Sequence, residues 1–183
     1  MTDETLRLDK GSKTREITIG SIPVGGGAPI SLQSMCATKT QDVEATLKQI
    51  KLLEDAGADL IRIAIDSKKD VEALEEISDR TDANLVIDLQ ENYRLAETVA
   101  PLVQKFRYNP GHLHHHQKEV SVQDKVKFLV ECAVKNDCAM RIGVNFGSLD
   151  PSLKDTGVSS MDVALKSADE HCQMVEDLSL IHI

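Results

Sequence analysis

Three arginines occupy matching positions in three separate apolar segments of the chain. Arg62 lies in segment 60–64, Arg107 in segment 105–109 and Arg141 in segment 140–144. A guanidinium group is planar and can bind two phosphate oxygens at once. If these segments are neighbouring parallel strands, the three side chains converge on one ligand. We therefore expect a phosphate-rich anion to bind here, the alternative being that each arginine pairs with a nearby carboxylate.

Further polar residues follow the same kind of segment. Asp88 ends the apolar segment 85–88, where it either accepts a hydroxyl of the ligand or caps the next loop. Asn109 and Asn145 either bind ligand oxygens or satisfy backbone groups of their loops. Gln33 and Ser34 end an earlier segment, and ordinary loop hydrogen bonding is the competing interpretation. With the three arginines, these residues form the predicted substrate-binding set, while the catalytic acid and base stay unassigned.

Two other motifs invite a chemical interpretation. The glycine run 25–27 lacks the Lys-Ser or Lys-Thr pair of a P-loop and opens no helix, so it predicts a turn. The tract of His112, His114, His115 and His116 has no partner cysteine or second histidine pair at zinc-site spacing. It predicts a solvated loop with incidental affinity for transition metals. We expect no metal site in this chain.

The elements that must position these residues are visible as alternating patterns. Apolar, β-prone segments alternate with amphipathic segments of helical spacing. The predicted strands are 16–20, 30–35, 60–65, 84–89, 106–109 and 139–145, and the predicted helices are 43–56, 70–77, 93–103, 122–135 and 161–178. Continuous apolar strands are typical of a parallel sheet covered by helices. The predicted fold class is α/β, an incomplete (β/α)8 TIM-barrel type with about five βα units after a short N-terminal β-hairpin.

The sequence predicts one folded unit between two tails. Residues 1–15 form a polar N-terminal tail, and residues 16–178 form a partial TIM-barrel domain that binds the substrate. We expect residues 179–183 to be a non-native tail, because the last six residues can be encoded by a transposon end used as a sequencing adaptor. A natural short tail is the alternative.

Composition argues against several classes of function. The net charge is −9 and aromatic residues make up 3% of the 183 residues, so the features of a nucleic acid-binding protein are missing. No apolar run is long enough to span a bilayer, and the acidic start of the chain does not fit a secretory signal. The four scattered cysteines form no C-x-x-C pair and predict free thiols. We expect a cytoplasmic protein that binds neither nucleic acid nor membranes.

A series of short motifs occurs in a specific order. The motifs are Ala28-Pro29-Ile30, Gln33-Ser34-Met35, Asp42-Val43-Glu44-Ala45-Thr46, Arg62, Arg107-Tyr108-Asn109-Pro110-Gly111, Arg141-Ile142-Gly143-Val144-Asn145 and Gly147-Ser148-Leu149. Together, over about Ile17 to Asp177, they resemble the N-terminal barrel of the 4-hydroxy-3-methylbut-2-enyl diphosphate synthase family. Segment 89–93 departs from that family, because it lacks the histidine that usually follows the aspartate.

The resemblance implies an oxidoreductase activity. Members of that family reductively convert 2-C-methyl-D-erythritol 2,4-cyclodiphosphate to 4-hydroxy-3-methylbut-2-enyl diphosphate, in the methylerythritol phosphate pathway of isoprenoid (terpenoid) biosynthesis. The barrel binds the cyclic diphosphate, and a separate domain holds a [4Fe-4S] cluster on three Cys and one Glu. No cysteine of this chain matches a cluster ligand. The resemblance therefore implies an iron-sulfur domain in the full-length protein that is absent from this chain.

The resemblance also implies partners. Ferredoxin or flavodoxin is the expected electron donor, and a homodimer is expected in which the cluster domain of one subunit closes the barrel of the other. We expect the 183-residue chain on its own to be inactive. Two other interpretations stay open, a pterin-type synthase barrel that needs no iron-sulfur domain, and a non-catalytic phosphate-binding domain.

Overall fold

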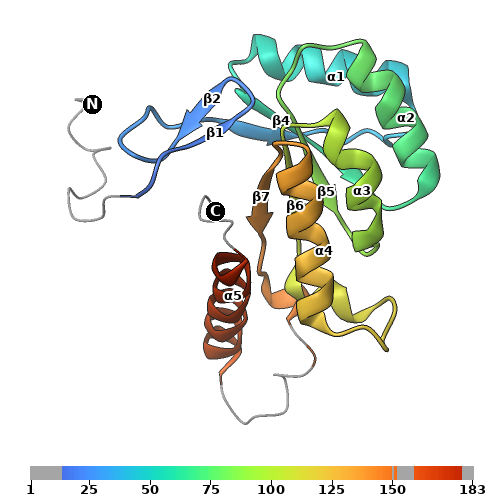
Figure 1. Ribbon diagram of the computed structural model, residues 1–183. Coiled ribbons are helices and arrows are strands. Elements are labelled where there is room, and N and C mark those ends of the chain that lie inside the picture. The colour runs from blue at the N-terminus through green and yellow to red at the C-terminus, as the bar shows by residue number, and fades with distance from the viewer. Residues whose placement is uncertain (1–13, 150, 152–158, 179–183) are drawn as a thin grey trace.

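The fold is built on one parallel sheet. The computed structural model describes residues 14–149, 151 and 159–178, so the predicted tails 1–15 and 179–183 lie almost entirely outside the described residues. The strands are hydrogen-bonded in chain order, β3 (Gln33–Met35), β4 (Leu60–Ile65), β5 (Leu85–Leu89), β6 (Lys105–Tyr108) and β7 (Ala139–Ile142). Every neighbouring pair is parallel, and β3 and β7 are the edges of an open sheet (Figure 1).

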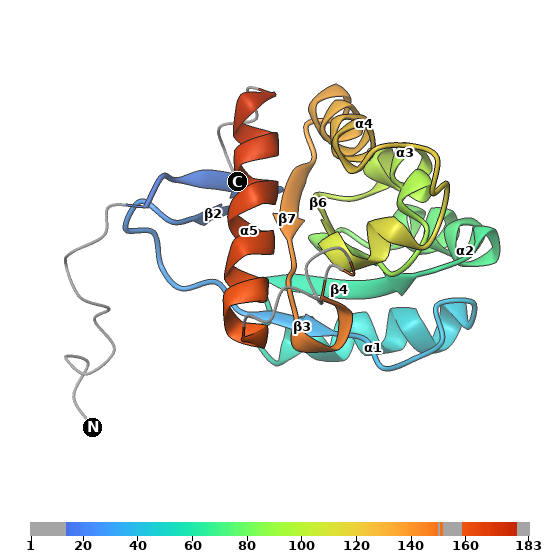
Figure 2. The same ribbon diagram turned by 90° about the horizontal axis from the view of Figure 1, so that it is seen from below.

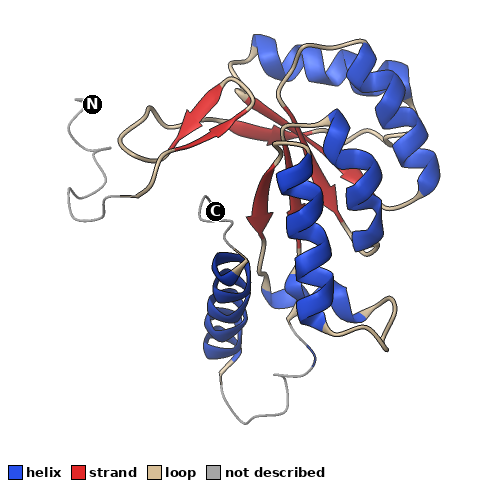
Figure 3. Ribbon diagram, in the orientation of Figure 1, coloured by secondary structure: helices blue, strands red, loops and turns tan. Residues whose placement is uncertain are grey.

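A helical segment follows each strand of this sheet. The α-helices are α1 (Val43–Asp55), α2 (Lys68–Asp79), α3 (Ala96–Val99), α4 (Val122–Lys135) and α5 (Ser160–Asp177), and the 3-10 helices are η2 (Tyr93–Leu95), η3 (Ala100–Leu102), η4 (Pro110–His114) and η5 (Phe146–Ser148). Helices α1 to α4 lie along one side of the sheet (Figure 3). The predicted fold class, five βα units of an incomplete TIM-barrel type, is confirmed. Within the described residues, no helix is long and apolar enough to cross a membrane.

The two faces of the sheet differ in chemistry, because successive side chains of a strand point to opposite sides. On β4, Ile61, Ile63 and Ile65 are buried and belong to the core between the sheet and the helices. Leu74 of α2 and Leu129 of α4 are fully buried in the same core. Burying apolar surface contributes about 25 cal/mol per Å² to folding. The alternate strand positions point inward, away from the helices.

A hairpin covers the N-terminal end of the inner face. Its strands β1 (Ile17–Ile19) and β2 (Ile22–Val24) are antiparallel, and Figure 2 shows the hairpin on the side of the sheet away from α2 and α3. Ile19 is 3% exposed and packs with Leu60 and Val86 from the beginnings of β4 and β5. The hairpin therefore seals this end of the inner face with apolar side chains.

The hairpin settles one question that the sequence leaves open. The sequence predicts the first hairpin strand, but it allows segment 30–35 to be either the second hairpin strand or the first barrel strand. The structure assigns segment 33–35 to the barrel and segment 22–24 to the hairpin. The sequence did not predict the second hairpin strand because it contains Pro23. Proline is excluded from most strand positions and is tolerated only at edges such as this one.

The structure also corrects the predictions for two helices. The sequence places the N-cap of α2 at Asp70, but Ser67 is the cap, and its Oγ accepts a hydrogen bond from the Asp70 backbone N–H. The Asp70 carboxylate accepts from the Ser67 backbone N–H in return, which completes a capping box. The predicted helix 93–103 is divided into η2, α3 and η3. Pro101 has no N–H to donate within an α-helix, which explains why α3 ends and η3 begins at this point.

Replacing Ile19 with alanine should destabilise the protein, because the hairpin would lose its buried contact with the sheet. A buried isoleucine changed to alanine costs about 2–5 kcal/mol of unfolding free energy. Ile30 is 66% exposed and provides the matched control, for which a cost within about 0.5 kcal/mol is expected. Urea denaturation followed by circular dichroism would measure both variants. Equal effects would show that the hairpin is not part of the folded core.

Candidate functional site

The inward-pointing side chains lie in rows that the strand register sets. One row holds Arg62, Val86, Lys105 and Ala139, and the next row toward the C-terminal strand ends holds Ala64, Asp88, Arg107 and Arg141. The inner face therefore gathers four cationic side chains and one carboxylate from the strands. The C-terminal end of the strands is where TIM barrels bind their ligands. The structure thus brings the three predicted arginines and Asp88 onto one face.

Arg107 is held in place by two contacts. Its Nη1 lies 2.6 Å from Oδ1 of Asp88, and both side chains are largely buried, with 14% and 12% exposed. Its Nη2 donates to the carbonyl oxygen of Gly143 at 3.1 Å. For Arg107, the carboxylate-pairing alternative therefore holds. Asp88 orients the guanidinium group, which has five N–H donors and does not use all of them in these contacts.

Gly143 makes the position of Arg107 possible. A Cβ atom built on Gly143 would lie 1.9 Å from Nε of Arg107, closer than any non-bonded pair of atoms can approach. Only glycine lets the guanidinium group pack against the backbone at the end of β7. The sequence shows Gly143 within the Arg-x-Gly motif, but only the structure shows which side chain needs the space.

Arg62 and Arg141 have weaker contacts with protein groups than Arg107 has. Nε and Nη2 of Arg62 lie 3.2 Å and 3.1 Å from Sδ of Met35, and a thioether is a weak acceptor. Arg62 belongs to the deeper row, although the sequence places it at the rim with the others. Arg141 is exposed on the edge strand β7, and no acceptor among the described residues lies within hydrogen-bond distance of its side chain. Both guanidinium groups can therefore bind an anion.

Lys105 also lies on this inner face, where sequence reasoning did not place it among the candidate residues. It is 7% exposed, and its Nζ donates to Oε1 of Gln33 at 2.9 Å, although strands β4 and β5 separate the two residues in the sheet. Burial, together with the nearby charges of Arg141 and Arg62, lowers the pKa of Lys105 to about 8. The alternation Lys105-Phe106-Arg107 was the available signal, because it puts the lysine and Arg107 on one face.

The two predicted asparagines support loops in this structure. Oδ1 of Asn109 accepts from the Gly111 backbone N–H at 3.0 Å, and its Nδ2 donates to Oγ of Ser148 at 2.5 Å. Oδ1 of Asn145 accepts from the backbone N–H of Ser148 at 3.0 Å and from its Oγ at 2.8 Å. A Cβ atom on Gly111 would lie 2.1 Å from the Ser148 carbonyl oxygen, so these two loops pack backbone to backbone.

Gln33 and Ser34 point to opposite sides of β3. Gln33 pairs in register with the inward-pointing Leu60 and reaches Lys105. Ser34 pairs with Ile61, whose side chain lies in the core beneath the helices. Because in-register residues of neighbouring parallel strands share a face, Ser34 lies on the helix side, apart from the arginines.

The histidine tract lies apart from this face, in and just after η4. Nδ1 of His112 meets the backbone carbonyl of Gln90, and Nδ1 of His115 lies 3.5 Å from Oε1 of Glu91. The His112 and His115 rings stack with their centroids 5.2 Å apart. Across the described ranges, no group of three or more His, Cys, Asp or Glu side chains is placed to hold a metal ion.

Changing Gly143 to alanine should displace Arg107 and weaken the binding of an anion such as inorganic pyrophosphate. Loss of a charged hydrogen-bonding group predicts about tenfold weaker binding or more. Gly147 is the matched control, because a Cβ atom there would meet Oδ1 of Asn145 at an ordinary 3.4 Å. Isothermal titration calorimetry on both variants, with thermal melts to confirm folding, would measure the difference. Equal affinities would refute this role of Gly143.

Comparison with known proteins identifies several relatives. Residues 14–183 match the family described as the GcpE TIM-barrel domain. The 4-hydroxy-3-methylbut-2-en-1-yl diphosphate synthase (flavodoxin) of Rhodopirellula baltica is 55% identical over 167 residues, which cover 90% of this chain and 44% of that protein. Proteins of the same name from Nitratiruptor sp. and Marinomonas sp. are each 39% identical, over 93% and 92% of this chain and 46% and 44% of their own lengths.

A solved structure of a mandelate oxidase mutant is a more distant match. The match covers 92% of this chain and 75% of that protein. Its TM-score of 0.46 and sequence identity of 14% are too low to support an argument about function. The chain spans about half the length of the curated relatives it matches, 44% of one and 46% of another. The family match extends over residues 14–183, and the parallel sheet and helices agree with it. The chain therefore belongs to the GcpE family and carries part of its TIM-barrel domain.

Proposed function

We propose that this chain supplies part of the diphosphate-binding barrel of a 4-hydroxy-3-methylbut-2-enyl diphosphate synthase. The full-length protein would reductively convert 2-C-methyl-D-erythritol 2,4-cyclodiphosphate to 4-hydroxy-3-methylbut-2-enyl diphosphate. The observation that carries the proposal is the inner face, where four cationic side chains share the strand positions with the single carboxylate of Asp88. The similarity to synthases of this name favours this activity over a pterin-type synthase or a non-catalytic domain.

The proposed binding residues differ in their roles. Arg62 and Arg141 contact the diphosphate directly, since their guanidinium groups lack carboxylate partners among the described residues. Arg107 binds with the edge of its guanidinium group that Asp88 and the backbone of Gly143 leave available. A bidentate contact between arginine and phosphate fixes direction as well as charge. The arginines would therefore orient the substrate ring as well as attract it.

The asparagines have a supporting role in this proposal. Asn109 is 1% exposed, and both ends of its amide group have protein partners. Together with Asn145 it fixes the loops after β6 and β7, and these loops carry the backbone next to Arg107 and Arg141. A direct contact to ligand oxygens would need those capping bonds to break. We therefore assign ligand contact to the arginines first.

The cysteines of this chain do not fit an iron-sulfur cluster. Burial raises the pKa of Cys36 to about 11, that of Cys132 to about 11 and that of Cys138 to about 12. Iron is held by thiolates, which such burial disfavours. We propose that the [4Fe-4S] cluster implied by the family resemblance is held by residues of the full-length protein outside this chain. Flavodoxin, which the names of the relatives mention, is the proposed electron donor, with ferredoxin as the alternative.

We also propose a cytoplasmic homodimer. The four cysteines are free thiols, which fits a reducing compartment. The dimer rests on the family resemblance, in which the cluster domain of one subunit closes the barrel of the other. Sedimentation of the full-length protein, compared with that of the 183-residue chain, tests it directly. A full-length monomer, or an equally stable dimer of the short chain, would contradict this assembly.

Changing Arg141 to alanine in the full-length protein should weaken binding of the cyclodiphosphate by about tenfold to a hundredfold, because one charged contact is lost. Arg80 is the matched control, since it pairs with Glu44 and Glu76 on the outer helices. Its change to alanine should leave binding unchanged. Calorimetry would measure affinity, and product formation with a chemical reductant would measure turnover. If the Arg141 variant kept both, the proposed function would lose its main support.

A further inference from the structure

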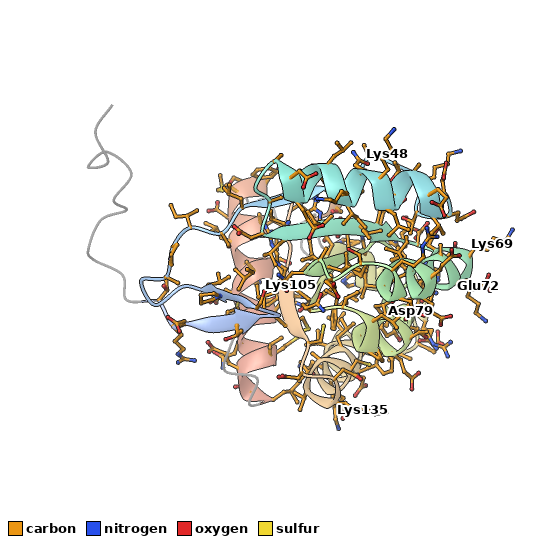
Figure 4. All side chains as sticks on the ribbon, turned by 90° about the horizontal axis from the view of Figure 1, so that it is seen from above. Lys48, Lys69, Glu72, Asp79, Lys105 and Lys135 are labelled. Carbon is orange, nitrogen blue, oxygen red and sulfur yellow. The ribbon has the colours of Figure 1, made fainter. Side chains whose placement is uncertain are left out.

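Lys105 occupies an unusual place for a lysine. Figure 4 shows it near the centre of the molecule, whereas Lys48, Lys69 and Lys135 point outward from the helices. Its Nζ crosses the inner face from β6 to the Gln33 side chain on β3, the opposite edge strand. Directly below it, toward the N-terminal strand ends, the apolar hairpin residues close the inner face. The ammonium group is thus held between an apolar floor and the arginine rows.

The charges that face Lys105 are almost all positive. Arg62 on β4 and Arg141 on β7 both oppose its protonation, and they act in addition to burial. Arg107 lies two residues along the same strand, but its charge is offset by Asp88 of β5. Strand β3 contributes the neutral side chain of Gln33, and the hairpin contributes the apolar side chain of Ile19, so neither adds a charge. No carboxylate of the described residues forms an ion pair with Lys105, so its charge lacks a counter-ion.

We propose that Lys105 is a fourth cationic anchor for the anionic substrate, and that substrate binding is coupled to uptake of a proton by this side chain. The inference rests on the proposed function of the inner face. Lys105 stands in the same register row as Arg62, one row below Arg107 and Arg141. A flexible lysine stem lets the ammonium group turn from Gln33 toward a phosphate oxygen above it. The bound anion then supplies the missing counter-charge.

The direction of the pH effect follows from the two states of the lysine. Without ligand, the pKa of Lys105 is lowered to about 8, so the side chain is mostly neutral above that pH. A bound anion favours the charged form and raises the pKa. Above about pH 8, binding therefore takes up a proton, whereas well below pH 8 the lysine is charged in both states and no proton is taken up. Affinity should fall as the pH rises through this range.

Calorimetry of the full-length protein tests the coupling. The heat of binding of 2-C-methyl-D-erythritol 2,4-cyclodiphosphate would be measured at pH 8.5 and pH 6.5, in buffers of different ionisation enthalpy. The slope against that enthalpy gives the number of protons taken up. We expect roughly half a proton or more per ligand at pH 8.5 and close to none at pH 6.5. The phosphates of a cyclic diphosphate do not titrate in this range, so the protein is the source of the signal.

Three variants separate the possible causes. Lys105→Met removes the charge at similar volume, and it should abolish the proton uptake and weaken binding at pH 6.5 by about tenfold or more. Lys105→Arg keeps a permanent charge, so it should bind without proton uptake even if the methionine variant folds poorly. Lys135→Met, at an exposed position on α4, should behave as the unmodified protein. Thermal melts would show that each protein tested is folded.

The outcomes distinguish this inference from the function on which it rests. If the unmodified protein binds the cyclodiphosphate but takes up no proton at pH 8.5, the coupling is refuted. Unchanged affinity and unchanged proton uptake in Lys105→Met would refute the anchor. If the unmodified protein does not bind the cyclodiphosphate at all, the proposed function itself fails, and this inference fails with it.

Discussion

Positive charge gathered on one face of a parallel sheet is the constraint on which the rest of this site depends. That face holds Arg62, Lys105, Arg107 and Arg141, with Asp88 as the strand carboxylate. Removing a charge from water costs roughly several kcal/mol unless a partner offsets it. Asp88 offsets only Arg107, so the other cations leave the inner face with an excess of positive charge. In the proposed function, an anionic ligand would relieve that excess, which would link ligand binding to the electrostatic stability of this domain.

The surrounding elements make that arrangement possible because the two faces of the sheet have different roles. Helices cover the outer face, whose isoleucines and leucines supply apolar burial, while the inner face is left for polar groups. The hairpin seals the N-terminal end of the inner face with Ile19 against Leu60 and Val86. The C-terminal strand ends, where TIM barrels bind their ligands, are not covered by it. At those ends, Gly143 and Gly111 let backbones and the Arg107 side chain approach more closely than a Cβ atom would permit.

Much of the fold follows from local patterns along the chain. The apolar segments 60–65 and 84–89 and the helix 122–135 agree closely with the structure, because their periods and caps are strong local signals. The hairpin strand with Pro23 and the division of segment 93–103 at Pro101 do not follow as easily. There a proline disrupts the local pattern, and contacts with distant parts of the chain decide what forms.

The sequence by itself determined that three arginines sit on three strands of one parallel sheet, since strand spacing and the alternation of side chains are local properties. Only the tertiary structure decided how each one is used. Arg107 meets Asp88 because neighbouring strands align those two residues in register, and Arg62 lies a row deeper for the same reason. Lys105 reaches Gln33 because the curved sheet brings β6 opposite β3. Register and curvature arise from packing across the whole domain, and no short stretch of sequence encodes them.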